Sequence, residues 1–233
     1  MKYKRILIKL SGEMLGSKGE AFSFRAALTA AEEIKSIVSK GLEVAILVGG
    51  GNIMRARDNK NMSRISADYM GMTATVINAL GLKDALTGVG VESVIFSALK
   101  VEGITEVLSA EKAVKCLKEK KVVIFAGGTG APYFTTDTAA VLRALEIKAD
   151  ILLKATKVEG LYSADPAKDK RAKILRGNIP LRMVIEKKLK IMDAAAFQLL
   201  YENNLGVIIF DFNKKGNLKK VIEGKAVGTV IGG

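Results

Sequence analysis

Six apolar runs of strand length divide this chain, and patterns typical of helices lie between them. The runs occupy residues 6–10, 44–48, 94–96, 122–125, 151–153 and 207–210. Strands that are apolar throughout, rather than in alternation, are buried on both faces. Strands that alternate with helices typically build a parallel sheet with helices on both of its sides. The chain is therefore predicted to be an α/β protein with a mostly parallel central sheet.

The helical patterns are marked by capping residues and by apolar stripes. Ser23 is expected to be an N-cap, and Gly41 follows the same helix at a position where a left-handed residue commonly ends one. The other helices are expected near residues 67–86, 111–120, 136–147 and 193–203. In the longest of them, Met70 and Met72 are expected in the core. No linker or internal repeat interrupts the pattern, so residues 1–233 are expected to form a single domain.

The composition narrows the chemistry that the chain can perform. It has 233 residues and no histidine, which excludes histidine general bases, histidine-based triads and most zinc sites. Its one cysteine, Cys116, excludes an internal disulfide and is expected to be a small packing residue. Catalysis must then rely on lysine, arginine, carboxylates, hydroxyls or backbone dipoles. Phosphoryl transfer assisted by magnesium is a reaction that these groups can perform.

Charge and hydropathy bear on the partners and the location. The formal net charge is +13, but the lysines are spread along the chain without a recognition motif or an aromatic platform for bases. We therefore expect a solvated basic surface that favours polyphosphate ligands, and not a nucleic-acid-binding protein. No apolar run approaches the roughly 20 residues of a membrane span, and the run at residues 6–10 is too short for a signal-peptide core. We expect a cytoplasmic protein with no membrane partner.

The stretch of residues 125–140 is the most informative segment for function. After the apolar run come three glycines within residues 127–130, and then two threonines and Asp137 open an alanine-rich helix. Glycines let the backbone turn sharply and expose its amides, and the positive end of a helix dipole attracts anions. Asp137 could hold a metal ion or order cationic side chains around a phosphate. A phosphate ligand is the first hypothesis, although such turns also occur without any ligand.

A second glycine-rich segment, residues 49–52, follows another apolar run. Three consecutive glycines at a strand end have a large entropic cost, which indicates close approach by another group. Neither segment fits the P-loop or the Gly-x-Gly-x-x-Gly pattern, so two familiar nucleotide folds lose support. Both segments fall at the carboxyl ends of strands, where parallel sheets bind ligands. Lys9 ends the first apolar run, and a lysine there is costly to bury unless it meets an anion.

Further motifs complete the pattern. They are Lys9, Leu10, Ser11, Gly12 and Glu13; residues 49–52 with Arg55; Ala67, Asp68, Tyr69, Met70, Gly71 and Met72; residues 127–137; Ala155, Thr156 and Lys157 with Tyr162 and Asp165; and Leu189, Lys190, Ile191, Met192 and Asp193. In this order and spacing, the chain closely resembles the bacterial UMP kinases of the amino acid kinase superfamily. The resemblance covers nearly the whole chain. It implies a three-layer αβα fold, the reaction ATP + UMP → ADP + UDP with magnesium, and a homohexamer.

The resemblance also implies a role for each matching residue, because the reaction must bring two polyanions together. Lys9 and Asp137 are the expected catalytic residues, with Asp137 ordering lysines and magnesium around the γ-phosphate. The expected ATP contacts are Lys9, Leu10, Ser11, Gly12, Gly51, Arg55, Thr156, Tyr162 and Asp165. The expected UMP contacts are Gly50, Asp68, Thr129, Gly130, Ala131, Pro132, Tyr133, Phe134, Thr135 and Thr136. Asp68 would accept hydrogen bonds from the ribose, and magnesium would be held mainly through the nucleotide phosphates. Asp193 is expected to be the N-cap of the last of the helices above.

The chain departs from its relatives at three places. Ala131 stands where many of them have asparagine, the loop between Arg55 and Asp68 is short, and residues 83–94 lack most of the arginine and histidine pattern of GTP-activated relatives. We therefore expect UTP to inhibit at the acceptor site, whereas activation by GTP stays open. Two other functions stay open: a kinase of the same superfamily that phosphorylates a small carboxylate or carbamate, and a nucleotide- or nucleic-acid-binding regulator without turnover.

Overall fold

A computed structural model describes residues 2–55, 61–164, 169, 171–186, 189 and 192–232 of the chain. The strands are β1 (Arg5–Leu10), β2 (Glu43–Val48), β3 (Ser93–Ser97), β4 (Glu106–Val107), β5 (Val122–Ala126), β6 (Ile151–Thr156), β7 (Leu161–Tyr162), β8 (Ile174–Leu175), β9 (Gly177–Ile179), β10 (Val207–Asp211) and β11 (Thr229–Ile231). The helices are η1 (Gly12–Met14), α1 (Phe24–Val38), α2 (Arg64–Gly88), α3 (Ala110–Lys118), α4 (Thr136–Glu146), α5 (Leu181–Glu186), α6 (Ala194–Glu202) and α7 (Asn217–Ile222). Every apolar run of the sequence lies within a strand, and every expected helix is present.

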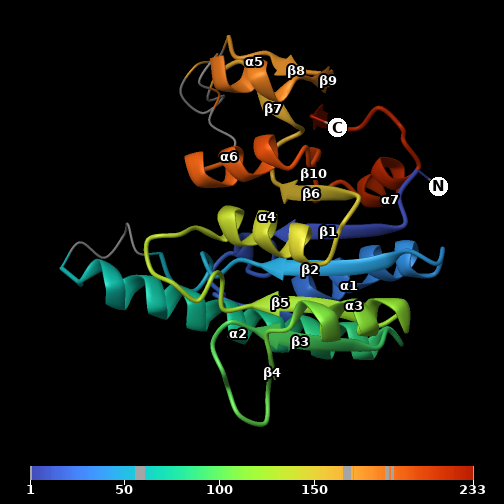
Figure 1. Cartoon of the computed structure of the whole chain (residues 1–233). Helices are drawn as coiled ribbons and strands as arrows, with labels where there is room; N and C mark the ends of the chain where they lie inside the picture. The colour runs from blue at the N-terminus through green and yellow to red at the C-terminus, as the bar shows by residue number, and fades with distance from the viewer. Residues whose placement is uncertain are drawn as a thin grey trace.

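One large sheet organises the molecule. Among the described residues, nine strands pair in the order β4-β3-β5-β2-β1-β6-β10-β11-β9 (Figure 1). Its pairs are parallel except for β10 and β11, which run antiparallel. The central strand β1 lies between β2 and β6, and in this register Lys9 is opposite Leu47 on one side and Lys154 on the other. The predicted mostly parallel sheet is confirmed.

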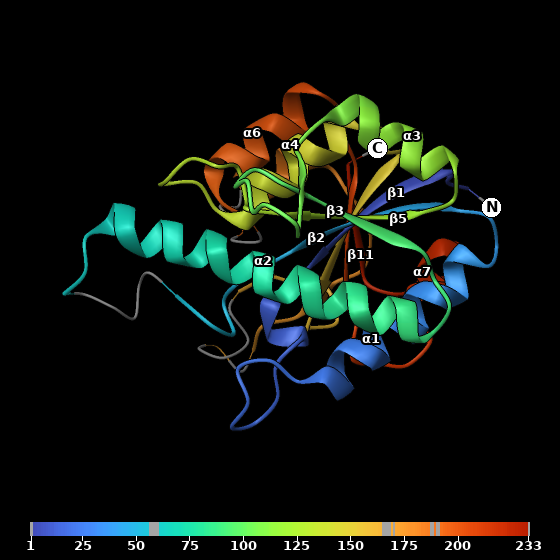
Figure 2. The ribbon, with the colours of Figure 1, turned by 90° about the horizontal axis from the view of Figure 1, so that it is seen from below.

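Helices cover both faces of the sheet, as the apolar strands require. Figure 2 shows α1, α2 and α7 on one side and α3, α4 and α6 on the other. Each layer buries its own apolar cluster against one face of the strands, with Ile8 and Ile46 in the first cluster and Leu7 and Leu47 in the second. Successive residues of a strand point to opposite faces, which is why neighbours along β1 and β2 belong to different clusters. The architecture is the expected three-layer αβα fold.

The helix α2 departs from expectation at its start and on one face. It begins at Arg64, where the Ser63 hydroxyl accepts a hydrogen bond from the Ser66 amide. The expectation for Met72 is confirmed because this side chain is 8% exposed, but Met70 is 47% exposed and does not lie in the core. An apolar stripe on a helix indicates that this face is packed, but it does not identify the packing partner. The face of α2 that carries Met70 points away from the sheet. No helix within the described residues, α2 included, has the length and apolar character needed to cross a membrane.

Candidate functional site

A cleft of about 700 Å³ opens where β1, β2 and β5 end, beside the N-terminal half of α2. Predicted ATP contacts that line it are Lys9, Ser11, Gly12, Gly51 and Arg55. Predicted UMP contacts that line it are Gly50, Asp68, Thr129, Phe134, Thr135 and Thr136. Segments far apart in sequence meet here because parallel strands deliver their following loops to the same edge of the sheet. Parts of both predicted contact sets therefore share one cleft.

Other predicted residues lie elsewhere. Leu10 is buried in the core beneath the cleft, so only its backbone faces the neighbouring loop. The loop tip carries Gly130, Ala131, Pro132 and Tyr133, and the Tyr133 side chain is 65% exposed. Thr156 is the last residue of β6, and its hydroxyl lies 2.9 Å from the carbonyl oxygen of Val158. Tyr162 is the last residue of β7 and pairs with Ile174 of β8. Asp165, residues 56–60 of the short loop, Lys190 and Ile191 lie outside the described residues.

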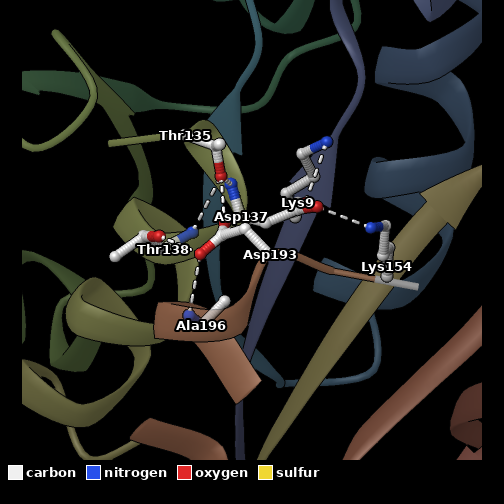
Figure 3. A network of polar contacts seen from close by, with 7 residues as sticks. All are labelled: Lys9, Thr135, Asp137, Thr138, Lys154, Asp193 and Ala196. Carbon is white, nitrogen blue, oxygen red and sulfur yellow. Dashed lines mark hydrogen bonds and ion pairs between the residues drawn. The ribbon is translucent and has the colours of Figure 1, made fainter. Parts of the chain in front are cut away.

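A compact charged centre adjoins the cleft through Lys9, which lines it, whereas its other members, Asp137 and Lys154, are not among the lining residues (Figure 3). Lys154 Nζ is 2.7 Å from Asp137 Oδ2, and Lys9 Nζ is 3.2 Å from Asp137 Oδ1. The three side chains are between 12% and 17% exposed. Lys9 and Lys154 reach the same carboxylate because they are register partners on the parallel strands β1 and β6, and Asp137 lies in the first turn of α4 above them. Two cations thus face one anion.

The protonation states of this centre follow from burial and charge. Burial would raise the pKa of Asp137, but the positive charges of Lys9 and Lys154 outweigh it and hold this pKa below its usual range. Burial lowers the pKa of Lys154, and Asp137 only partly offsets this effect. Asp137 is therefore ionised at neutral pH, and the excess positive charge of the two lysines suits an anionic ligand.

Lys154 was missed by sequence reasoning. The apolar run ends at Leu153, so the pattern assigns no role to Lys154, which follows it. The signal that could have found it is the same one that marked Lys9, namely a lysine at the end of a strand whose other residues are buried. Only the register of β6 against β1, two strands 145 residues apart, places it on the carboxylate of Asp137.

The start of α4 is fixed by a second carboxylate. Asp193 is the N-cap of α6 and accepts from the Ala196 amide at 3.0 Å, which confirms the capping role predicted for it. It also accepts from the hydroxyl of Thr138 at 2.8 Å and from that of Thr135 (Figure 3). Burial would raise the pKa of Asp193, but these hydrogen bonds hold it below the usual range. Thr135 is the N-cap of α4 and accepts from the Asp137 amide, so Asp193 joins the two helix starts next to the charged centre.

The first glycine loop (residues 49–52) is packed too closely for side chains. A Cβ on Gly50 would lie 2.5 Å from the carbonyl oxygen of Gly71 in α2, and one on Gly49 would lie 2.9 Å from the Gly12 amide. None of the three glycines has a positive φ among the described residues. The predicted close approach is thus present, and the approaching groups are α2 and the turn that follows β1.

The second glycine loop (residues 127–135) has a different geometry. Gly127 has a φ of +74° and Gly128 a φ of +58°, a region that side chains rarely adopt. The Gly127 amide donates to the Thr75 hydroxyl at 2.7 Å, and the Tyr133 amide donates to Asp68 Oδ2 at 2.7 Å. Both acceptors belong to α2, so this helix holds the second loop at two points.

Three ion pairs beside the cleft were also not predicted. Glu13 forms an ion pair with the guanidinium of Arg55 and lies 3.2 Å from Lys157 Nζ. Arg55 Nε donates to the Gly51 carbonyl at 2.7 Å. Arg64 Nε donates to Asp68 Oδ2 at 2.7 Å. Two predicted site residues are therefore held by charged neighbours: Arg55 by Glu13, which belongs to the first motif, and Asp68 by Arg64, which lies outside the motifs.

Known proteins resemble this chain over nearly its full length. The sequence model of the amino acid kinase family matches residues 4–211. The UMP kinase of Bacillus anthracis is 36% identical, with 99% of this chain and 96% of that chain covered and a TM-score of 0.94. The UMP kinase of Ureaplasma parvum is 36% identical, with both chains fully covered (100%) and a TM-score of 0.92. The uridylate kinase of Archaeoglobus fulgidus is 28% identical, with 97% and 99% covered and a TM-score of 0.75.

Proposed function

The chain belongs to the amino acid kinase family, and from that premise we propose that its cleft transfers the γ-phosphoryl group of ATP to UMP, giving ADP and UDP. The observation that carries the proposal is the full-length match, at 36% identity, to two UMP kinases. The charged centre supports the same reaction. Lys9 and Lys154 on Asp137 supply fixed positive charge at the point where the two predicted contact sets meet.

The chemistry fits a site without histidine. The acceptor is a phosphate that is already anionic at neutral pH, so no strong general base is needed. The main tasks are to hold two polyanions in line and to stabilise the charge on the transferring group. Lys9 and Lys154 perform the second task, and ionised Asp137 keeps both ammonium groups oriented between substrates. The loops perform the first task through backbone amides.

The two substrates are assigned to the two sides of the cleft. ATP lies against the turn after β1, with its phosphates near Ser11, Gly12 and Gly51. UMP lies against α2 and the second glycine loop, with its ribose near Asp68. Thr156 ends β6 and Tyr162 ends β7, and this side takes the adenosine. The assignment of the adenosine side rests on the family resemblance.

Magnesium enters with ATP and neutralises charge on its phosphate oxygens. The residues present fit this role. Asp137 Oδ1 is buried and accepts no hydrogen bond among the described residues, although Lys9 Nζ is 3.2 Å away, so a hard carboxylate oxygen is available. In the described part of the chain no three acidic, cysteine or histidine side chains gather as a metal site. This fits an ion that is held mainly by the nucleotide.

The assembly and its control form part of the same proposal. A homohexamer is supported by the exposed apolar side chains of α2, with Met70, Ile77 and Leu80 between 47% and 51% exposed in the single chain. UTP inhibits by occupying the acceptor site, since it carries the same base and ribose as UMP. The protein acts in the cytoplasm, in the synthesis of pyrimidine nucleotides.

The test is the release of ADP from ATP and magnesium with UMP, CMP, dUMP or acetylglutamate as acceptor. UMP should be preferred, because a pocket that pairs with a polar edge rejects analogues by up to about 10⁴-fold. Asp68→Asn should reduce the preference for UMP over dUMP as acceptor. It should leave the preference for UMP over CMP unchanged. Preference for acetylglutamate would favour the carboxylate kinase, and the absence of turnover with every acceptor would favour a regulator.

A further inference from the structure

A pair of hydrogen-bonded asparagines, buried Asn78 and half-buried Asn52, supports the first glycine loop. Asn78, in the middle of α2, has an exposed fraction of 0%. Its Nδ2 donates to Asn52 Oδ1 at 2.7 Å, and Asn52 Nδ2 donates back to Asn78 Oδ1 at 3.0 Å. Asn78 Nδ2 also donates to the Gly49 carbonyl at 2.7 Å. A buried amide is costly unless its hydrogen bonds are made, and here they are made to this one loop.

The pair supports two loops of the cleft and not one. A Cβ on Gly12 would collide with Asn52 Oδ1 and would lie 2.8 Å from the Gly49 carbonyl oxygen. The turn after β1 therefore rests on the same atoms that Asn78 holds. Asn52 Nδ2 also donates to the carbonyl of Ala21 at 2.6 Å, which ties in the segment before α1. Neither asparagine is among the described residues that line the cleft.

A role in stability alone does not account for this arrangement. The neighbours of Asn78 on the buried face of α2, such as Ala79 and Leu82, are apolar and have exposed fractions of 0%. Replacing a hydrogen-bonded buried pair by apolar groups of the same shape can be nearly neutral for stability. What an apolar pair could not do is hold the Gly49 carbonyl by a hydrogen bond, and with it the backbone of Gly50 and Gly51, which line the cleft.

We propose that Asn78, acting with Asn52, is a positioning residue for phosphoryl transfer. It holds the first glycine loop in the position where this loop can contact the phosphates of both substrates. The inference rests on the proposed function for its kinetic consequence. Because Gly50 and Gly51 serve the two substrates at their point of contact, a displaced loop weakens the transition state more than either bound substrate. Such a loss lowers kcat and leaves the KM values nearly unchanged.

The experiment compares Asn78→Leu with the control Leu82→Ala, which removes packing from the same helix without touching a loop. Asn78→Leu should lower kcat by about 10- to 100-fold with the KM values for ATP and UMP within about twofold, as expected for a small misplacement of reacting groups. Leu82→Ala should lose thermal stability and keep kcat. Asn52→Ser is a milder change at the loop and should also lower kcat. It replaces Asn78→Leu in the comparison if that variant does not fold.

A second readout does not depend on the substrates. Hydrogen–deuterium exchange of the peptide that covers residues 48–54 should speed up in Asn78→Leu or Asn52→Ser, and not in Leu82→Ala. Unchanged exchange there, or an equal loss of kcat in Leu82→Ala, would overturn the positioning role. If the unmodified protein does not phosphorylate UMP, the proposed function fails, and the exchange measurement still decides the inference.

Discussion

The two glycine loops follow buried parallel strands at the same edge of the sheet, yet they need glycine for different reasons. In the first loop, Gly49 and Gly50 have ordinary φ values and no room for a Cβ, because α2 and the turn after β1 press against their backbone. In the second loop, Gly127 and Gly128 have positive φ values, and the nearest atom to a Cβ on Gly128 is the Met72 side chain at 3.5 Å. The first loop is constrained by its neighbours. In the second loop, Gly128 is constrained by its own backbone and Gly127 by both, because its Cβ would also lie 2.8 Å from the Leu99 amide nitrogen.

The two loops illustrate two ways in which a loop can be held in position at a site: by close packing and by its own dihedral angles. A loop held by close packing transmits any displacement of its neighbours to the groups it presents, which makes its geometry a property of the tertiary structure. A loop held by its own dihedral angles keeps its shape locally and needs only anchoring, which Thr75 and Asp68 supply from α2. Lys9 lines the cleft together with residues of both loops, so substitutions there and in each loop can test the comparison.

The largest effect on kcat is expected at Lys9. Lys9→Met should lower kcat by about 10²–10³-fold, because one fixed charge on the transferring group is lost. The fold should survive, since the methionine side chain suits the apolar strand. Steady-state kinetics beside circular dichroism tests this, with Lys35→Met on the exposed face of α1 as the matched control. Near-normal kcat in Lys9→Met would remove Lys9 from the mechanism.

A smaller effect separates neighbours within the first loop. Gly50→Ala should lower kcat by about 10²-fold, because its Cβ would displace the loop from the α2 backbone and a shift of about 1 Å can cost that much. Gly51→Ala should keep most of the activity, since its Cβ would meet only the flexible Arg55 side chain at 3.5 Å. Equal kinetic losses in both variants would show that close packing is not what the first loop requires.

The second loop should respond in stability. Gly128→Ala places a side chain at a φ of +58° and should lower the free energy of unfolding by about 1–2 kcal/mol. Gly51→Ala, at an ordinary φ, should change it far less. Urea unfolding followed by circular dichroism measures both. A Gly128→Ala protein as stable as the unmodified one would contradict the assignment of backbone strain to this loop.

The smallest effect is a displacement along the pH axis at the charged centre. Burial lowers the pKa of Lys154, so this side chain loses its proton at a lower pH than an exposed lysine does. The alkaline decline of kcat/KM, which reports the free enzyme, should therefore begin below pH 10.5, the ordinary value for lysine. Lys154→Arg stays charged throughout and should remove this decline in whatever activity remains. If kcat/KM of Lys154→Arg declines at the same pH as in the unmodified protein, another group is responsible for the decline.

Much of the fold was predictable from local sequence. Wholly apolar runs indicated β1, β2 and β5 as buried strands, and the glycines after β2 and β5 indicated loops at their carboxyl ends. Lys9 stood out because a charge is costly near the end of a buried strand, and Asp137 because it follows a glycine-rich turn at the start of a helix. The capping role of Asp193 was also predicted, because a carboxylate before an apolar helical pattern is a local signal.

The rest was decided by contacts between segments that are distant in the chain. Lys154 joins Lys9 only through the register of two strands, and Asn78 meets the Gly49 carbonyl only because α2 packs behind that loop. The exposure of Met70 likewise depends on which face of α2 the sheet covers. Local sequence determined where strands, loops and costly charges lie, because propensity and burial act on neighbouring residues. The tertiary structure decided which charges and amides meet, because those energies depend on distances that the sequence does not contain.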